Sequence, residues 1–558
     1  MGDDSRRSWL ALGALLLVAS AIVAGAFVPA PHNGGDNAAY VTLAYSLLAD
    51  GSYTDLYDPA AMPHTKYPPV FPGLLALLVL LGARTWTALK IVAALSAVAG
   101  VGFTFLWSER RWGTATGFVV ALGVALSSGV VYYSHWVLSD TLFLALTVAA
   151  LWLFERSEEE SSGPGWLVAG VIVAGLAYFT RSAGLPLLVA VFAWLALARR
   201  WKALAGTAMG LGLPVLTWWW RGRGAGVAEY GAEFWLVDPY QPELGRVGFA
   251  GLAGRVVTNF GGYLTLHLPG GIVGGGGGGF VALVGIGLTA LALVGWFRSA
   301  RARMGVAELF LPAYAGLILL WPEVWSGDRF ALPLIPLFLG FGAAALQHFS
   351  GRLGGQAARA VLVLAALIIV VPSGRSWTRS VGEAMSCTAA TRVGGAWACY
   401  GPAVTRFADA AGWAGEALPE GSAVMTRKPR IFYVLSGVPS RTFPFVSETG
   451  EQFRIADEVG ARYLLFDEWF SQSGRFLGAA LTQQPGAFCT VRGFGQTQGV
   501  GTHLFGLLPA ERRGVPDGDG GNEVRVAGCP EGYVLPGAPA DYSSSSSTRI
   551  PLLDRLDP

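Results

Sequence analysis

The sequence predicts a polytopic α-helical membrane protein, with about eleven transmembrane helices followed by a soluble α/β domain. Only 14% of the 558 residues are charged, against roughly a quarter in soluble domains. Hydrophobic residues make up 53% of the chain, and they gather in blocks of about 15 to 20 residues, which is close to the length that crosses a bilayer. The formal net charge of +2 gives no electrostatic reason to expect a nucleic-acid partner.

Eleven apolar blocks are predicted to cross the membrane. Their bounds are 9–28, 86–106, 115–131, 140–154, 166–179, 184–198, 204–220, 280–297, 306–321, 331–346 and 358–371. Residues 67–81 are also apolar, but Pro68, Pro69 and Pro72 interrupt them. Proline disfavours a continuous helix interior, so we expect a membrane-surface or re-entrant helix there. A full crossing by this segment would reverse the side of everything after it.

The basic residues orient the chain. Arg6 and Arg7 precede the first block, which places the N-terminus in the cytoplasm by the positive-inside rule. Alternating the blocks then puts the short basic loops at 110–111, 199–202 and 298–303 on the same side, and everything after residue 371 outside the cytoplasm. All four cysteines lie in that last region: Cys387, Cys399, Cys489 and Cys529. Thiols can pair outside the cytoplasm, and four of them allow three connectivities.

Three regions are expected along the chain. Residues 1–373 form the membrane domain, with long outer loops at 29–85 and 221–279. Residues 374–510 are predicted to fold as an extracytoplasmic α/β domain, because short strand-like runs at 423–426, 463–466, 488–491 and 502–507 alternate with helical ones. The tail at 511–558, rich in Gly, Asp and Pro and carrying a serine run, is predicted to be disordered.

Two carboxylates are predicted to lie at the outer face of the membrane. Asp36 follows two glycines in the first outer loop, and Asp140 stands where the third block gives way to the fourth. Carboxylates close to a bilayer are costly, so they are candidates for function. The alternative interpretations are a solvated turn for Asp36 and a helix N-cap for Asp140.

Three cations are expected on the same face, namely Lys66, Arg181 and Arg329. Their position runs against the positive-inside bias, which favours an anionic ligand. The alternatives are snorkelling toward lipid headgroups and, for Arg329, a local ion pair with Glu323 or Asp328.

The sequence neither predicts nor excludes a metal site. Glu323, His135 and His64 are candidates for binding an acceptor or a metal ion, and a divalent cation is one cofactor compatible with them. However, the sequence contains no His-x-x-x-His or Cys-x-x-Cys spacing. The sequence therefore does not identify a cofactor.

Taken in order, these motifs resemble the GT-C superfamily of membrane glycosyltransferases, close to the protein O-mannosyltransferases and the lipid A aminoarabinose transferase. The resemblance covers the apolar blocks to about residue 346 and extends loosely to a soluble outer domain. The matching segments are Gly35-Asp36-Asn37-Ala38-Ala39-Tyr40, Lys66-Tyr67-Pro68-Pro69, Ser139-Asp140-Thr141-Leu142-Phe143, Arg181, and Arg329-Phe330-Ala331-Leu332-Pro333-Leu334-Ile335-Pro336.

The resemblance implies a glycosyltransferase that takes its sugar from a polyprenyl-phosphate donor in the lipid bilayer. The acceptor would be a hydroxyl of a glycan, lipid or protein outside the cytoplasm. By the matching motifs, Asp36 would be the catalytic carboxylate, Asp140 the second acid, and Lys66 and Arg329 contacts to the donor phosphate. Thr65 stands where an acidic metal ligand would be expected, which argues against a zinc site of that kind.

The chemistry of these residue types agrees with the resemblance. An acceptor hydroxyl holds its proton tightly, so a carboxylate such as Asp36 can assist attack by taking that proton. Lys66, Arg181 or Arg329 can stabilise the charge on the leaving phosphate, and a single displacement inverts the anomeric carbon. The alternative class is a membrane transporter or lipid flippase. Transporters commonly show internal repeats and midplane sites, and we find no such repeat in the sequence.

Overall fold

The computed structural model describes residues 3–159, 163–221, 223, 230–241, 244–495, 501–513, 526–539 and 549–556. Contacts divide the chain into two units. The first, here called the helical unit, comprises Met1–Phe27, Thr65–Phe71 and Lys90–Ala384. The second, here called the mixed unit, comprises Val28–His64, Pro72–Leu89 and Met385–Pro558.

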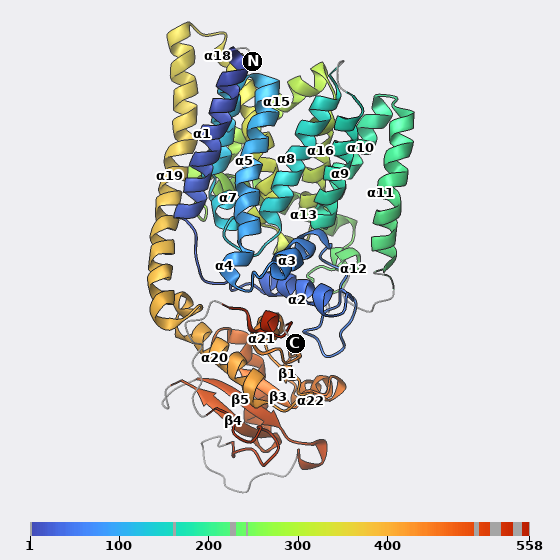
Figure 1. Ribbon diagram of the computed structural model, residues 1–558, viewed down its shortest axis with the longest axis vertical. Helices are drawn as coiled ribbons and strands as arrows, with labels where there is room; N and C mark the ends of the chain where they lie inside the picture. Colours follow the sequence, from blue (N-terminus) through green and yellow to red (C-terminus); the bar gives the residue numbers. More distant parts are fainter. Residues whose placement is uncertain are drawn as a thin grey trace. The chain divides into compact units, whose positions relative to one another are not determined.

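The helical unit is a bundle, drawn from blue to yellow in Figure 1. Every predicted apolar block corresponds to one helix or to two consecutive helices of the structure. Its helices are α1 (Asp3–Gly25), α5 (Ile91–Trp112), α6 (Thr114–Leu126), α7 (Ser128–Tyr133), α8 (Asp140–Ser157), α9 (Gly165–Thr180), α10 (Leu185–Leu197), α11 (Trp201–Arg221), α12 (Tyr230–Phe234), α13 (Phe249–Gly262), α14 (Leu268–Val273), α15 (Gly279–Ala302), α16 (Val306–Leu320), α17 (Asp328–Ala331), α18 (Ile335–Ser350) and most of α19 (Gly355–Gly394). The short α4 (Trp86–Leu89), which precedes α5, and the end of α19 belong to the mixed unit.

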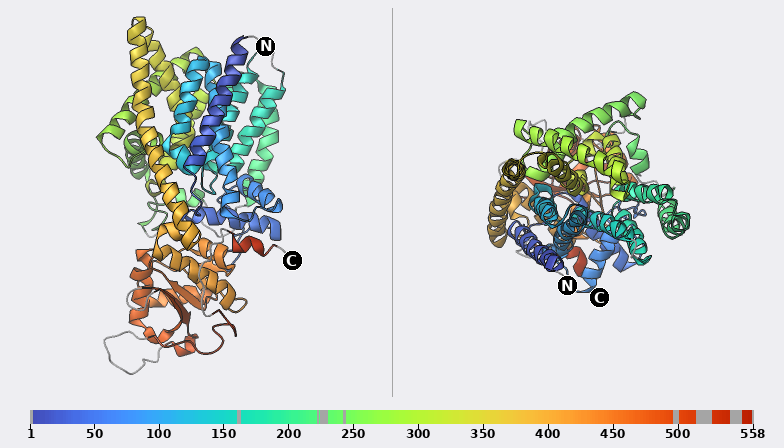
Figure 2. Two further views of the ribbon diagram at one scale, coloured as in Figure 1. Left: turned by 60° about the vertical axis from the view of Figure 1, so that its left-hand side comes forward. Right: turned by 90° about the horizontal axis from the view of Figure 1, so that it is seen from above.

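Close helix packing holds the bundle together. Helix α8 packs between α5 and α9, with Phe143, Leu144 and Phe154 buried in the shared core. Helices α15 and α18 lie especially close, because a Cβ added at Gly295 would collide with the backbone carbonyl of Phe341. Figure 2 shows the bundle end-on, with α1 in dark blue beside α5.

Several helices have the dimensions of membrane spans. Among the described residues, five are long and apolar enough to cross a bilayer: Arg6–Gly25, Trp86–Trp112, Gly279–Ala302, Asp328–Ser350 and Gly355–Gly394. Only 6% of the apolar window of α19 is buried inside the protein. A soluble protein rarely exposes an apolar surface of that extent, whereas a lipid-facing helix does. The chain is therefore an integral membrane protein.

Part of the predicted loop 221–279 is instead helical. Helix α13, a π-helical turn at Tyr263–His267 and α14 follow one another without a break. Arg255 and Asn259 are buried there, and the Asn259 amide nitrogen donates to the Trp321 carbonyl at 2.8 Å. These polar residues and the surrounding glycines interrupt the apolar pattern, which is why the sequence gives no sign of a helix.

The mixed unit contains a five-stranded sheet of order β2-β1-β3-β5-β4. Strands β2, β1 and β3 are parallel, while β3, β5 and β4 are antiparallel. The main strands lie where the sequence predicts them. The elements are β1 (Val424–Met425), β2 (Ser440–Arg441), β3 (Tyr463–Phe466), β4 (Phe488–Phe494) and β5 (Thr502–Leu507), with helices α20 (Pro402–Ala417), α21 (Pro429–Ser436), α22 (Thr449–Glu458) and α23 (Gly478–Gln483).

Most of the loop 29–85, assigned from sequence to the membrane domain, packs with this sheet-bearing unit. Its helix α2 (Gly35–Ala49) contacts α21 and the C-terminal α24 (Pro551–Asp554). The apolar segment at 67–81 forms α3 (Val70–Leu80), whose 11 residues extend only about 16 Å. That is too short to cross a bilayer.

The four cysteines form two disulfides, Cys387–Cys399 and Cys489–Cys529. The second draws part of the predicted tail onto the sheet, where Gly528 also bridges Thr490. Further along, Leu552 and Leu553 are buried in the mixed unit. For 526–539 and 549–556 the prediction of disorder is therefore wrong, while 514–525 and 540–548 lie outside the described residues.

Candidate functional site

Asp36 lies in the first turn of α2. The chain turns into this helix where the Gly34 amide donates to His32 Nδ1 at 2.9 Å. The Asp36 side chain is 31% exposed, and Arg430 Nη1 lies 3.9 Å from its Oδ1. A helix N-terminus and a nearby guanidinium both favour a negative charge at this position. Asp36 is thus a half-exposed carboxylate held by a helix and a cation, and not a free turn residue.

A basic segment that the sequence does not single out lies close to Asp36 in the mixed unit. Arg427, Lys428 and Arg430 surround the start of α21, where Lys428 is the N-cap. The pKa of Lys428 falls to about 8, because burial and then the Arg427 charge disfavour the ammonium form, with Asp36 and Asp467 opposing them. The mixed unit therefore contributes its own cations beside the predicted base.

Asp140 is the first residue of α8 and is buried. Its Oδ1 accepts from Arg181 Nη1 at 2.6 Å and from Arg329 Nε at 2.7 Å. The structure thus brings three predicted site residues into one cluster, although they come from α8, the end of α9 and α17. Ser139 occupies the N-cap position of α8, so the alternative interpretation of Asp140 as the helix N-cap does not hold, and Asp140 is instead a partner of two arginines.

The second oxygen of the Asp140 carboxylate differs from the first in its hydrogen bonding. Asp140 Oδ2 is buried and has no hydrogen-bond partner within the described part of the chain. A buried acceptor without a donor carries a desolvation cost. The cluster also holds two guanidinium groups for one carboxylate, and Arg181 lies 5.4 Å from the Phe330 ring. It can therefore accept a further donor or anionic group.

Lys66 is paired with a residue that the sequence analysis does not identify. Its Nζ lies 2.6 Å from Glu233 Oε1 and 5.8 Å from the centre of the Trp325 ring. Glu233 is buried. Lys66 is thus a partly covered cation whose charge already has a carboxylate partner.

The residues predicted to bind an acceptor or a metal ion do not form one cluster. His64 is buried and its Nδ1 lies 2.8 Å from Asp55 Oδ1, whereas His135 packs edge-on against Trp136 and Glu323 is exposed in a short loop. Across the described ranges, no three His, Cys, Asp or Glu residues lie close enough together to hold a metal ion. These residues therefore do not fit a metal site.

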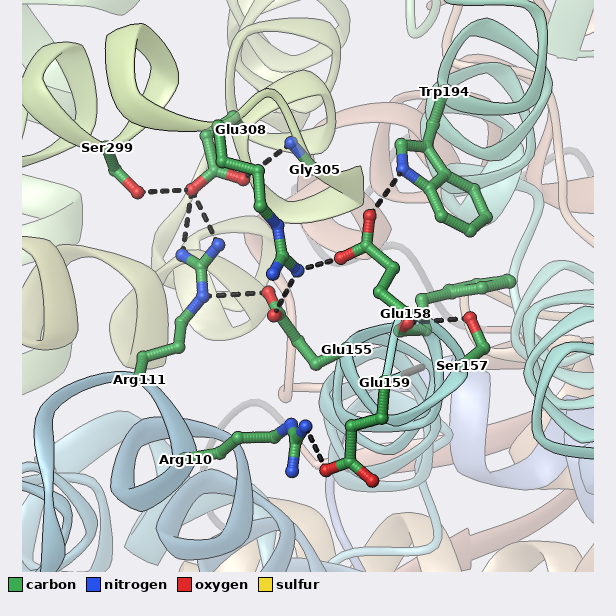
Figure 3. A network of polar contacts seen from close by, with 12 residues as sticks. Arg110, Arg111, Glu155, Ser157, Glu158, Glu159, Trp194, Ser299, Gly305 and Glu308 are labelled. Carbon is green, nitrogen blue, oxygen red and sulfur yellow. Dashed lines mark hydrogen bonds and ion pairs between the residues drawn. The ribbon is translucent and has the colours of Figure 1, made fainter. Parts of the chain in front are cut away.

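A second charged cluster lies at the other end of α8, as Figure 3 shows. Arg111 donates to Glu155 Oε1 at 2.7 Å and to Glu308 Oε1 at 2.7 and 2.8 Å. Glu308 also accepts from Ser299 Oγ at 2.7 Å, and Arg303 donates to Glu155 Oε2 at 2.7 Å. A cavity of about 810 Å³ adjoins this cluster. The sequence reveals the arginines as basic loops, but not their buried glutamate partners.

Comparison with known proteins supports the resemblance predicted from the motifs. Residues 66–220 match the family described as dolichyl-phosphate-mannose-protein mannosyltransferase. No curated protein sequence matches the chain.

Solved structures match over most of the chain. The oligosaccharyltransferase of Archaeoglobus fulgidus, crystallised with zinc and sulfate, has a TM-score of 0.56 at 14% identity, over 88% of this chain and 72% of that one. ArnT from Cupriavidus metallidurans in the apo state has a TM-score of 0.53 at 14% identity, over 90% and 98%. Its complex with undecaprenyl phosphate gives 0.52 at 12% identity, over the same shares.

These similarities define the class of protein at the level of the fold. The chain has the fold of the GT-C glycosyltransferases, with a helical bundle and an additional sheet-bearing unit. Identities of 12 to 14% carry no substrate from those proteins to this one, because fold does not fix function.

Proposed function

We propose that this protein is a glycosyltransferase that moves a sugar from a polyprenyl-phosphate donor to an acceptor hydroxyl. The observation that carries the proposal is the half-exposed Asp36 carboxylate at the start of α2, 3.9 Å from Arg430, in a chain with the GT-C fold. Proteins of this fold have been solved in complex with undecaprenyl phosphate and with a dolichol phosphate, which supports the donor class.

Asp36 acts as the general base. The acceptor oxygen attacks the anomeric carbon, the bond from that carbon to the phosphate oxygen breaks, and the acceptor proton passes to the Asp36 carboxylate. The products are the glycosylated acceptor and the polyprenyl phosphate. Because this is one displacement with one base and no covalent enzyme intermediate, the anomeric configuration inverts.

Asp140 is a positioning residue in this scheme. Its Oδ1 fixes both Arg181 and Arg329, and cations held in place before the reaction stabilise developing charge without reorganising. Together with Lys66, these arginines are the proposed contacts to the donor phosphate in the helical unit.

The reaction takes place outside the cytoplasm. The positive-inside rule places the N-terminus in the cytoplasm, and eleven crossings then place the C-terminal domain outside. The pairing of all four cysteines in two disulfides supports this assignment, since disulfides persist in oxidising compartments. No structural observation favours the alternative of a transporter or flippase.

The test is the substitution Asp36→Asn in detergent-purified protein. Asparagine keeps the size and hydrogen bonding of aspartate but cannot take the proton, so transfer should fall by about 10²- to 10⁴-fold. Asp50→Asn is the matched control, because Asp50 lies at the opposite end of α2, where its exposed side chain accepts from Ser52. Near-normal transfer by folded Asp36→Asn protein would remove Asp36 from the mechanism.

A further inference from the structure

The segment Arg427-Lys428-Pro429-Arg430 concentrates positive charge beside Asp36. All four residues and Asp36 belong to the mixed unit, where α21 packs against α2. The three cationic residues, Arg427, Lys428 and Arg430, are each only partly buried, so a ligand can reach them. Three cations within four residues at the N-terminus of a helix form a place where an anion is favoured, because the helix dipole adds to the side-chain charges.

Aromatic rings hold these cations in place. Lys428 Nζ lies 4.5 Å from the centre of the Phe470 ring and 5.7 Å from that of Trp469. The Arg427 guanidinium lies 5.3 Å from the Phe470 ring, and that of Arg430 lies 5.3 Å from the Tyr57 ring. Ring faces attract cations without neutralising them. The segment is therefore positioned while its net charge is kept.

Two carboxylates, Asp467 and Asp36, act on the Lys428 ammonium. Asp467 is buried, and its oxygens accept from Ser473 Oγ at 2.7 Å and from the Trp469 and Phe470 amides at 3.0 and 3.2 Å. Asp36 is the other carboxylate that acts on Lys428. One of the two carboxylates that act on Lys428 is thus already committed to a turn.

The cations predicted to contact phosphate in the helical unit each form an ion pair with a buried carboxylate. Lys66 is paired with Glu233, and Arg181 and Arg329 share Asp140. An anion that binds any of these cations must share it with a buried carboxylate. Lys428 has ring contacts as its side-chain partners, and no carboxylate forms an ion pair with it in the part of the chain that the structure describes.

We propose that Arg427, Lys428 and Arg430 form a binding site for a phosphate group of a substrate, next to the Asp36 carboxylate. The proposal rests on the function proposed above, because it makes the mixed unit a direct participant in substrate binding. Two substrates could supply the phosphate: the polyprenyl-phosphate donor, or an acceptor that carries a phosphate near its reacting hydroxyl.

Binding of three probes to the full chain in detergent tests the site without requiring turnover. The probes are undecaprenyl phosphate, undecaprenol and glycerol phosphate, titrated by calorimetry. We expect Lys428→Gln and Arg430→Gln each to weaken binding of a phosphate probe about tenfold, since each removes a charge-assisted contact. Undecaprenol should be unaffected. Arg454→Gln is the control, because Arg454 is an exposed residue of the same unit, paired with Glu451 and Glu458 on α22.

The outcomes separate the sources of the phosphate. Weaker binding of undecaprenyl phosphate identifies the donor, and weaker binding of glycerol phosphate alone identifies an acceptor phosphate. Lys428→Arg should restore affinity, which a merely misfolded variant would not do. Unchanged affinity for both phosphates in folded Lys428→Gln and Arg430→Gln proteins, or no phosphate binding by the wild type, overturns the site. Because no transfer is measured, this result is independent of whether Asp36→Asn remains active.

Discussion

Helix α8 carries a buried charged cluster near each of its ends, and the two are built differently. At its start, Asp140 receives both arginines on one oxygen and leaves the other without a partner among the described residues. Near its end, each oxygen of Glu155 and Glu308 accepts at least one hydrogen bond. The first cluster thus leaves one buried carboxylate oxygen unsatisfied, whereas the second satisfies all four of its carboxylate oxygens.

The difference indicates what each cluster is for. Buried polar groups are usually satisfied, and a fully bonded network fixes the helices that contribute to it. The Arg111 cluster joins α5, α8 and α16 in this way, and we infer a structural role. An unsatisfied buried acceptor beside two guanidinium groups calls for another explanation, and binding of a hydrogen-bond donor is one.

The largest expected effect is on stability, at the Arg111 cluster. Glu308→Ala leaves the buried Arg111 without one of its two carboxylates, and breaking a buried pair typically costs about 3–5 kcal/mol. Thermal unfolding in detergent should show a lower midpoint, with turnover per folded molecule unchanged. Glu451→Ala is the control, because its partner Arg454 is exposed and surface pairs contribute about 0–1 kcal/mol. Equal midpoints for the two variants would contradict the structural assignment.

The next effect is on transfer, at the Asp140 cluster. Arg329→Ala should lower turnover by about 10²-fold, the loss expected when one preorganised charge-stabilising donor is removed. The unfolding midpoint should change less than in Glu308→Ala, because Arg329 is partly exposed and Arg181 still pairs with Asp140. If Arg329→Ala kept wild-type turnover but strongly lowered the unfolding midpoint, the Asp140 cluster would be structural, like the Arg111 cluster.

The smallest effect is a pH dependence in the mixed unit. With a Lys428 pKa of about 8, the ammonium is charged below that pH and neutral above it, so phosphate affinity should fall as pH rises through 8. Arg427 and Arg430 keep their charge over this range, while Asp36 and Asp467 face the same ammonium. The decrease should not exceed the loss of about tenfold expected for Lys428→Gln, because the neutral amine of Lys428 can still donate a hydrogen bond. Lys428→Arg should flatten the profile between pH 7 and 9.5, since arginine does not deprotonate there. A decrease of the same size in that variant would contradict the assignment to Lys428.

Hydropathy predicts the helices well and the charged partners poorly. Strands β3 and β5 and the apolar helices lie where composition and periodicity place them, because both signals are local. The sequence does not predict that Glu155 and Glu308 are buried. Charged residues near basic loops are normally solvated, and only the packing of the helices shows that these two are not. The basic segment at Arg427 is missed for the same reason: its meaning depends on α21 lying against α2, which are distant in sequence.

The central claim is that the sugar comes from a lipid-linked phosphate donor. The most direct test supplies the purified protein with a polyprenyl-phosphate sugar and a mixture of acceptors, and follows the lipid by mass spectrometry. We expect free polyprenyl phosphate to appear in step with glycosylated acceptor of inverted anomeric configuration, and we expect Asp36→Asn to stop both. Consumption of a nucleotide sugar by the purified protein alone, with the lipid donor untouched, would contradict it.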